Sequence, residues 1–339
     1  MAFEKEIKEY EDLRGKYQTL IINKMDREEY IKYNEVLFST FSCAIEGNSF
    51  SVDDTRELKE KGLGMIPAGK TLFEAFEMLD HFEAFEYMMQ NTQHPLDENL
   101  LKEINRRVTC HTLSYRSPEA IPGEYTTTDM AAGDTVFGDH EELIARIPKL
   151  LESTEKAIVS AAVHPMILAA RFHGFYEYLH PFRDGNGRTG RLISNYILLR
   201  LNHPLLIIPS EARQEYISAL RMIRTEATDE HLIRFFFKMA KQRMEEELKQ
   251  KEANTKRFMT FLFLYGQTFY GFRHIRTKTF YGFRQNKVKT FCGFRQNPYL
   301  CTHKSLIISK IWSKPNYSKE KYTKRCSDGK KSDREKPPY

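Results

Sequence analysis

The stretch from residue 180 to 191, HPFRDGNGRTGR, gathers residue types that bind phosphate and a metal ion. Gly185 and Gly187 flank Asn186 where a helix is expected to begin, so free backbone N–H groups and the helix dipole there favour an anion. Asp184 adds a hard oxygen ligand of the kind that Mg²⁺ prefers. These four residues predict an anion-binding loop with a place for a divalent cation.

Two arginines and a histidine extend this predicted site. Arg188 and Arg191 stand about one helical turn apart, which places two positive charges beside the same loop. Pro181 disfavours the α conformation in the residue before it, so the preceding helix is expected to end at His180. A histidine at the rim of such a site is a candidate general base near neutral pH. Singly these residues have ordinary structural explanations, but together they predict a polyphosphate site with a metal.

The stretch resembles the signature of the Fic family, HPF-x-[DE]-GNG-R-x-x-R, and it fills every fixed position. The resemblance covers roughly residues 25–250. It implies an all-α fold, a helical bundle with a small β-hairpin flap, and an enzyme that transfers AMP from ATP to a hydroxyl group of a target protein or of itself. Two alternatives stay open within the family: removal of AMP, and transfer of another phosphate-containing group.

The resemblance also implies a role for each residue of the motif. His180 would take the proton from the attacking Ser, Thr or Tyr hydroxyl, and Asp184 would hold Mg²⁺ against the α- and β-phosphates of ATP. Arg188 and Arg191 would bind the β- and γ-phosphates. The anion hole would consist of Gly185, Asn186 and Gly187. Phosphoryl-type transfer asks mainly for such positioning and charge stabilisation, with one base to activate the nucleophile.

A second motif, SCAIEG at residues 42–47, resembles the inhibitory pattern [ST]-x-x-x-E-[GN] of the same family. Ser42 and Glu46 are four residues apart and share one helix face. Glu46 lies in the last turn, where the helix dipole disfavours a carboxylate by roughly 0.3–1 kcal/mol. The resemblance implies that Glu46 pairs with Arg191 and blocks the γ-phosphate, as in autoinhibited relatives. The alternative is an exposed glutamate near a frayed helix end.

Two departures from the family concern the nucleobase and the target. Many relatives carry a Tyr-Tyr pair downstream of the motif, where this sequence has Tyr216 and Ile217. Tyr216 is a candidate to stack on the adenine, or else an ordinary core or surface tyrosine. Arg224 stands where relatives often have Asn, and Thr126 stands in the flap where relatives often have Arg.

The elements that must position these residues are mostly helices. Asp26 can cap a helix over about residues 26–47, the expected inhibitory helix, and capping-box spacings start two more helices at Ser51 and Thr71. Apolar residues recur at helical spacing near 98–113, 141–161, 165–179, 187–201, 210–225 and 229–250. Between 123 and 138 the pattern breaks, and β-branched residues around Gly133-Asp134 predict a short hairpin.

Charge divides the 339 residues sharply. Residues 251–339 hold 21 of the 52 Lys and Arg and 5 of the 46 Asp and Glu, a net charge of +16, so residues 1–250 carry −10. We therefore predict an N-terminal helical region (1–60), a catalytic domain (61–250) and a disordered, basic, low-complexity tail (251–339) with TFYGFR-like repeats. A rival interpretation is a nucleic-acid- or membrane-surface-binding protein that acts through this tail.

The composition of the sequence limits the class of protein and its expected location in the cell. Hydrophobic residues at 41% suffice for a globular core, and no window approaches the ~18 apolar residues of a membrane span. The N-terminus alternates charges, unlike a signal or transit peptide. Five cysteines at no repeating spacing argue against a disulfide framework. We expect a cytoplasmic protein that uses ATP and Mg²⁺, whose partner is a target protein; the core would bind neither nucleic acid nor membrane, and a homodimer is compatible with the sequence.

Overall fold

The computed structural model describes residues 3–64, 66–132 and 135–270. The chain divides into two compact units, Met1–Thr255 and Lys256–Tyr339, and the predicted site lies in the first. Among the described residues, no helix has the length and apolar character that crossing a membrane requires.

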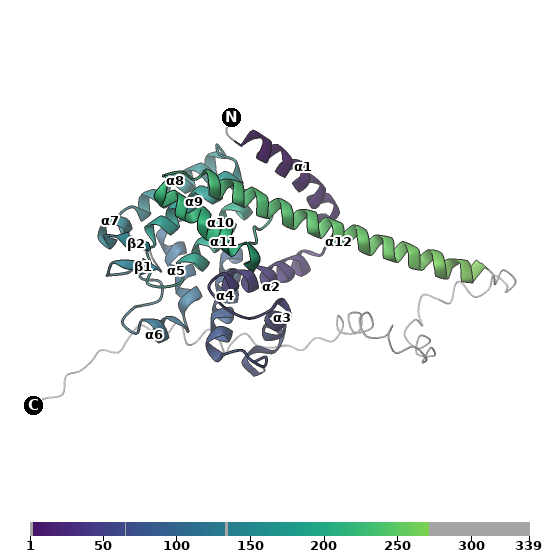
Figure 1. Cartoon of the computed structure of the whole chain (residues 1–339), viewed down its shortest axis with the longest axis horizontal. Helices are drawn as coiled ribbons and strands as arrows, with labels where there is room; N and C mark the ends of the chain where they lie inside the picture. The colour runs from purple at the N-terminus through teal and green to yellow at the C-terminus, as the bar shows by residue number, and fades with distance from the viewer. Residues whose placement is uncertain (1–2, 65, 133–134, 271–339) are drawn as a thin grey trace, which may run out of the picture. The chain divides into compact units, whose positions relative to one another are not determined.

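The first unit is a helical bundle with one small hairpin, as predicted (Figure 1). The α-helices of the described residues are α1 (Glu4–Leu20), α2 (Arg27–Ile45), α3 (Val52–Lys61), α4 (Leu72–Gln90), α5 (Glu98–Thr109), α6 (Leu113–Arg116), α7 (His140–Ile144), α8 (Ile147–Ser160), α9 (Pro165–Leu179), α10 (Asn186–Arg200), α11 (Arg213–Thr225) and α12 (Glu230–Tyr270), of which α12 belongs to the first unit up to Thr255. Short 3₁₀ turns cover Ile22–Lys24, Gly62–Gly64 and Ser210–Ala212.

The predicted helix starts are confirmed. The Asp26 side chain accepts hydrogen bonds from the first-turn N–H groups of α2. Ser51 and Thr71 each form a complete capping box, which begins α3 and α4. The expected helix over 26–47 is therefore present as α2, and it ends just before Gly47, whose φ of 103° suits glycine.

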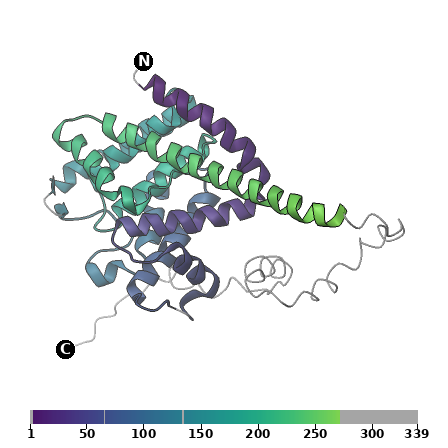
Figure 2. The ribbon, with the colours of Figure 1, turned by 45° about the vertical axis from the view of Figure 1, so that its right-hand side comes forward.

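The centre of the bundle is the pair α9 and α10, which pack against each other (Figure 1). Helices α4 and α5 cover α10, and α8 and α11 cover α9. The start of α12 contacts both α1 and α2, and Figure 2 shows it passing between them. A smaller apolar cluster of Cys43, Phe50, Leu58, Ala75, Met78 and Phe82 joins α2, α3 and α4. This cluster fixes the end of α2 against the rest of the bundle.

The hairpin consists of β1 (Met130–Ala132) and β2 (Thr135–Gly138), which pair antiparallel with a register shift after Met130. Gly133 and Asp134, the predicted turn, lie outside the described residues. The segment before the hairpin is tied to the motif loop, because the Thr126 N–H donates to the Pro181 carbonyl at 2.8 Å. The hairpin therefore lies next to the end of α9.

The disorder of the tail stays a prediction, but α12 extends past residue 251, where the tail was predicted to begin. Helix α12 continues without a break through residues 251–270. Residues 251–265 contain neither Gly nor Pro, so no residue there stops a helix. Most of the TFYGFR-like repeats and the basic run to residue 339 lie outside the described residues. The rival interpretation, in which the tail binds nucleic acid or a membrane surface, therefore stays a prediction.

Candidate active site

The motif loop joins the end of α9 to the start of α10. His180 follows the last residue of α9 and has a φ of 47°, a left-handed conformation that turns the chain out of the helix. Gly185 precedes α10 with a φ of 77°, and a β-carbon there would lie 2.7 Å from the Thr109 methyl carbon. Both the backbone angle and the close packing require glycine at this position.

The first turn of α10 begins at the motif loop, and the Glu46 side chain lies against its backbone at Gly187. No side chain of the described residues caps it. Asn186 instead exchanges two hydrogen bonds with the backbone of Phe182, at 3.0 and 2.6 Å, and so holds the loop in shape. The N–H groups of this turn, with the positive end of the helix dipole, form the predicted anion-binding position.

Arg188 is buried, with 1% of its surface exposed, and points to α4. Its Nη1 lies 2.8 Å from Oε1 of Glu77, and its Nη2 lies 3.4 Å from Oδ1 of Asp184. Burial works to lower the pKa of Arg188, but these two carboxylates raise it above its ordinary value. Sequence reasoning missed Glu77, since nothing in the local pattern of α4 distinguishes it from other charged residues.

Asp184 has a second arginine beside it. Nη1 of Arg116, at the end of α6, lies 3.1 Å from Oδ2 of Asp184. The Asp184 carboxylate is partly exposed at the edge of the anion-binding turn. Among the described residues, no group of three or more His, Cys, Asp or Glu side chains could hold a metal. A single carboxylate beside a phosphate position fits a Mg²⁺ ion that takes its other ligands from phosphate oxygens and water.

Arg191 is also buried, and α2 supplies its partners. Its Nη2 donates to Oε1 of Glu46 at 2.7 Å and to the Ser42 carbonyl at 2.8 Å, while its Nε donates to the Ser42 hydroxyl at 3.0 Å. Burial works to lower the pKa of Arg191, but Glu46 and Tyr216 raise it. The ion pair that the second motif implied is thus present, and both of its motif residues contribute.

Tyr216 lies in the core beneath Arg191, with 1% exposed. Its hydroxyl is 2.6 Å from Nε2 of His173 and accepts from Nη1 of Arg191 at 3.4 Å. Its ring stacks on His173 with centroids 5.7 Å apart. Burial lowers the pKa of His173 to about 4. In this conformation Tyr216 supports Arg191 from within the core, and its part in binding the adenine stays a prediction.

His180 stands at the edge of the site between the hairpin and α9. Its ring stacks on Phe137 of β2, with centroids 4.0 Å apart and planes inclined by 19°. Its Nδ1 is 3.7 Å from Oε2 of Glu177. Burial works to raise the pKa of Glu177, but His180 and His173 hold it below its ordinary value. The Glu177 carboxylate therefore lies on the Nδ1 side of the imidazole.

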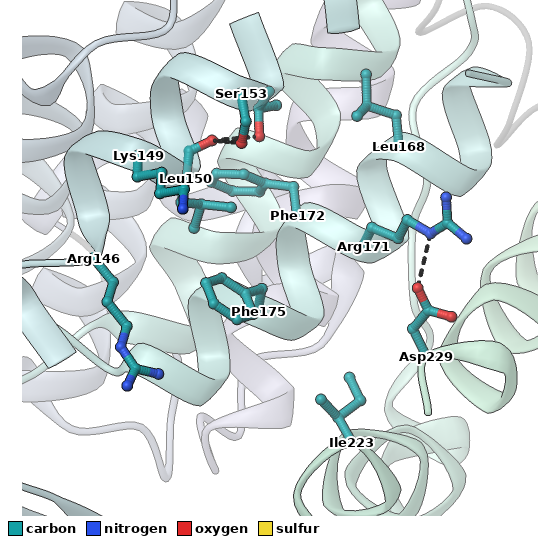
Figure 3. A pocket seen from close by; sticks show the side chains of 11 residues that line it. Arg146, Lys149, Leu150, Ser153, Leu168, Arg171, Phe172, Phe175, Ile223 and Asp229 are labelled. Atoms are coloured by element: carbon teal, nitrogen blue, oxygen red, sulfur yellow. Dashed lines mark hydrogen bonds and ion pairs between the residues drawn. The ribbon is translucent and has the colours of Figure 1, made fainter. Parts of the chain in front are cut away.

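A separate pocket of about 600 Å³ lies between α8, α9 and α11 (Figure 3). Its floor is apolar, with Leu150 and Phe172, and on its rim Arg171 is paired with Asp229 at 2.8 Å. None of the predicted site residues lines this pocket. The chemistry-bearing residues gather instead around the start of α10.

The fold and the site define a class: a helical bundle whose central helix begins at a glycine-bordered turn with buried arginines beside it. Residues 95–198 match the model of the Fic/DOC family, so the chain carries a Fic domain. Protein adenylyltransferase fic-1 of Caenorhabditis briggsae is 29% identical over 226 residues, covering 64% of this chain and 42% of the relative. Protein adenylyltransferase Fic of Drosophila grimshawi is 32% identical over 186 residues, covering 53% and 36%.

Solved structures share the fold. A Fic-domain-containing signaling protein from Bacteroides thetaiotaomicron superposes with a TM-score of 0.62 at 24% identity, covering 72% of this chain and 97% of that one. Fic-1 from C. elegans superposes with a TM-score of 0.60 at 24% identity, covering 74% and 73%. The chain spans about two-fifths of the length of the curated relatives that it matches.

Proposed function

We propose that this chain is a protein adenylyltransferase, which transfers AMP from ATP to a Ser, Thr or Tyr hydroxyl of a target protein or of itself. The observation that carries the proposal is the uncapped first turn of α10, which is bordered by Gly185, flanked by buried Arg188 and Arg191, and covered by the Glu46 side chain at Gly187. Such a turn binds phosphates through backbone N–H groups, and the two guanidinium groups add charge-assisted donors. The relatives named as protein adenylyltransferases support the same reaction.

In this reaction the target hydroxyl oxygen bonds to the α-phosphorus of ATP, and the bond from that phosphorus to the bridging oxygen breaks. Pyrophosphate leaves, and the hydroxyl proton passes to His180. Glu177 stabilises the positive charge that the imidazole then carries. The N–H groups of Asn186 and Gly187 and the side chain of Arg188 stabilise the phosphate oxygens. Bound Mg²⁺, held by Asp184, would neutralise further negative charge on the phosphates.

We further propose that Glu46 restrains this activity. Its carboxylate occupies Arg191, the group that would otherwise bind the γ-phosphate. A nucleotide whose γ-phosphate finds no partner is held less firmly, and its α-phosphorus is not presented correctly to the incoming hydroxyl. The restraint lies on the same chain, because Ser42 and Glu46 both belong to the α2 end.

The test is direct. Purified full-length protein is incubated with α-³²P-labelled ATP and Mg²⁺, and incorporated label and a mass increase of one AMP on the chain are measured. His180→Ala is the matched control, since it removes the proton acceptor and leaves the phosphate-binding groups. Absence of label with wild type and with Glu46→Gly, at saturating ATP and with candidate targets supplied, would contradict the proposal.

Removal of AMP is a second candidate, favoured by the position of Glu46. Its carboxylate is partly exposed beside the first turn of α10, where it could orient a water molecule toward a bound AMP-protein. Incubation of an AMP-modified chain without ATP distinguishes the two reactions. Loss of AMP with wild type but not with Glu46→Gln would favour removal.

A further inference from the structure

Phe137 in β2 covers one face of the His180 ring, as described above. Because the hairpin is only two short strands, it needs support from outside to hold this position. A residue of α11 that contacts the Phe137 ring provides that support. Arg224 in α11 places its guanidinium carbon 4.4 Å from the centre of the Phe137 ring.

Arg224 also contacts the end of α9. Its Nη2 donates to the carbonyls of Glu177 at 3.0 Å and Tyr178 at 2.5 Å. Its guanidinium carbon lies 4.5 Å from the centre of the Tyr178 ring. These two carbonyls belong to the last turn of the helix, where the carbonyl groups lack partners within the helix. A cation at this end is also favoured by the helix dipole.

Both contacts lead to His180. The left-handed backbone of His180 directly follows the turn that Arg224 caps, and such a conformation persists in a residue with a side chain only where the surroundings fix it. The imidazole stacks on the Phe137 ring, and Arg224 contacts that same ring. A planar guanidinium can stack between two rings and donate in its own plane at once, whereas a lysine ammonium cannot.

We propose that Arg224 is a positioning residue for His180: it fixes the end of α9 and holds Phe137 over the imidazole. The inference rests on the proposed function only in naming His180 as the base. Whatever reaction the protein catalyses, we expect the His180 ring to become more mobile when Arg224 is removed.

The test therefore uses a chemical readout that needs no enzymatic activity. Diethyl pyrocarbonate is applied to the full-length protein, and the rate of carbethoxylation at His180 is followed by peptide mass spectrometry. Arg224→Ala is expected to speed modification of His180 by about two- to five-fold, the population change that follows from one lost cation–π contact. Phe137→Ala is expected to speed it as well, and the double variant should be faster than Phe137→Ala alone by less than Arg224→Ala is faster than wild type, because only the contact with the end of α9 is then left to lose.

Arg221→Ala is the matched control, because this exposed arginine lies on the same helix one turn earlier. A His180 rate within error of wild type in Arg224→Ala would overturn the proposal, and so would an equal rise in Arg221→Ala. Arg224→Lys serves if the alanine variant does not fold; it keeps the charge but not the paired donation, and an unchanged His180 rate there also overturns the proposal. In an active preparation, kcat should fall while the affinity for ATP stays unchanged, a division that general loss of folding would not produce.

Discussion

A β-carbon placed on Gly187 would lie 2.3 Å from Oε1 of Glu46, so the glutamate side chain rests directly on the backbone of that glycine. The same oxygen accepts the hydrogen bond from Arg191. One carboxylate thus covers the first turn of α10 and holds its arginine, two positions that a phosphate chain would use.

Glu46→Gly is expected to raise the initial rate of AMP incorporation. We expect the rate to rise about 5- to 150-fold, because coupling free energies between two sites typically correspond to factors of this size. The rise would come from loss of the ion pair with Arg191 and from uncovering the first turn of α10. The substitution costs little folding stability, because Glu46 follows the last residue of α2 and Gly47 already ends the helix. Incorporation of label from ATP is compared among wild type, Glu46→Gly and Glu46→Gly with Arg191→Ala. The double variant should be slow again, and a single variant no faster than wild type would show that Glu46 is not the restraint.

His180→Ala should reduce AMP transfer by about 10²- to 10⁴-fold, the usual contribution of a general base. The substitution removes the proton acceptor but touches none of the groups around the first turn of α10. The affinity for ATP, measured by calorimetry in the Glu46→Gly background, should stay within about a factor of three of its value without the His180 substitution. A ten-fold loss of affinity would require the loss of about 1.4 kcal/mol of binding free energy, and no phosphate-binding group is removed. Transfer at a near-normal rate would mean that another group accepts the proton.

Arg213→Ala should partly release the restraint. Nε of Arg213, at the start of α11, donates to the Ile45 carbonyl at 2.7 Å, next to Glu46. Loss of this cation at the end of α2 is expected to raise the AMP-transfer rate by about two- to five-fold, from the usual energy of a charge at a helix end. In the Glu46→Gly background the same substitution should have no effect on the rate. An equal rise in both backgrounds would show that Arg213 acts elsewhere.

Folding stability should depend on pH through His173. The pKa of this buried imidazole is about 4 in the folded protein and 6.5 ordinarily, so between these values the unfolded chain binds more protons. The contribution of His173 to the free energy of unfolding is therefore fully present above pH 6.5. It is lost as the pH falls toward 4, by about 3 kcal/mol in total. Burial raises the pKa of Asp80 to about 6, which acts in the opposite direction, so the comparison must be with a variant.

The variant is His173→Gln, which keeps a hydrogen-bonding side chain near Tyr216 and does not titrate. The difference in unfolding free energy between wild type and variant, from urea titrations at pH 4.5, 5.5 and 7, should grow with pH. A difference that stays constant across this range would mean that His173 titrates normally in the folded state.

A chain that ends at Thr255, the last residue of the first compact unit, should keep its fold and its catalytic rate. The residues that this truncation removes include none of the groups around α10. The melting temperature should change by less than about 3 °C, the shift that roughly 1 kcal/mol produces in a domain of this size. A loss of cooperative melting would show that the removed residues stabilise the bundle.

The sequence predicted local features well, because caps and helix ends depend on near neighbours. Asp26 begins α2 as expected, and α9 ends one residue before His180. The resemblance added the long-range contact between α2 and Arg191, which no local pattern contains.

What the sequence did not reveal are contacts made by ordinary residues from distant elements. Glu77 lies in the middle of α4 and shows its importance only when α10 brings Arg188 to it. Phe137 meets His180, and Arg224 meets Phe137, only through the packing of the hairpin and α11. The helical course of residues 251–270 was missed because composition, rather than helix-stopping residues, was used to place the boundary.

Among the described residues, three arginines around the start of α10 each lie against a carboxylate. They are Arg188 with Glu77, Arg116 with Asp184, and Arg191 with Glu46. A polyanion entering such a site must bring its own cation or exchange places with one of the resident anions. The Glu46 side chain is 32% exposed, against 18% for Asp184 and 3% for Glu77, so it is the anion most easily transferred to water. If the proposed function holds, a nucleotide would bind here by anion exchange, and the anion that leaves would come from the end of α2.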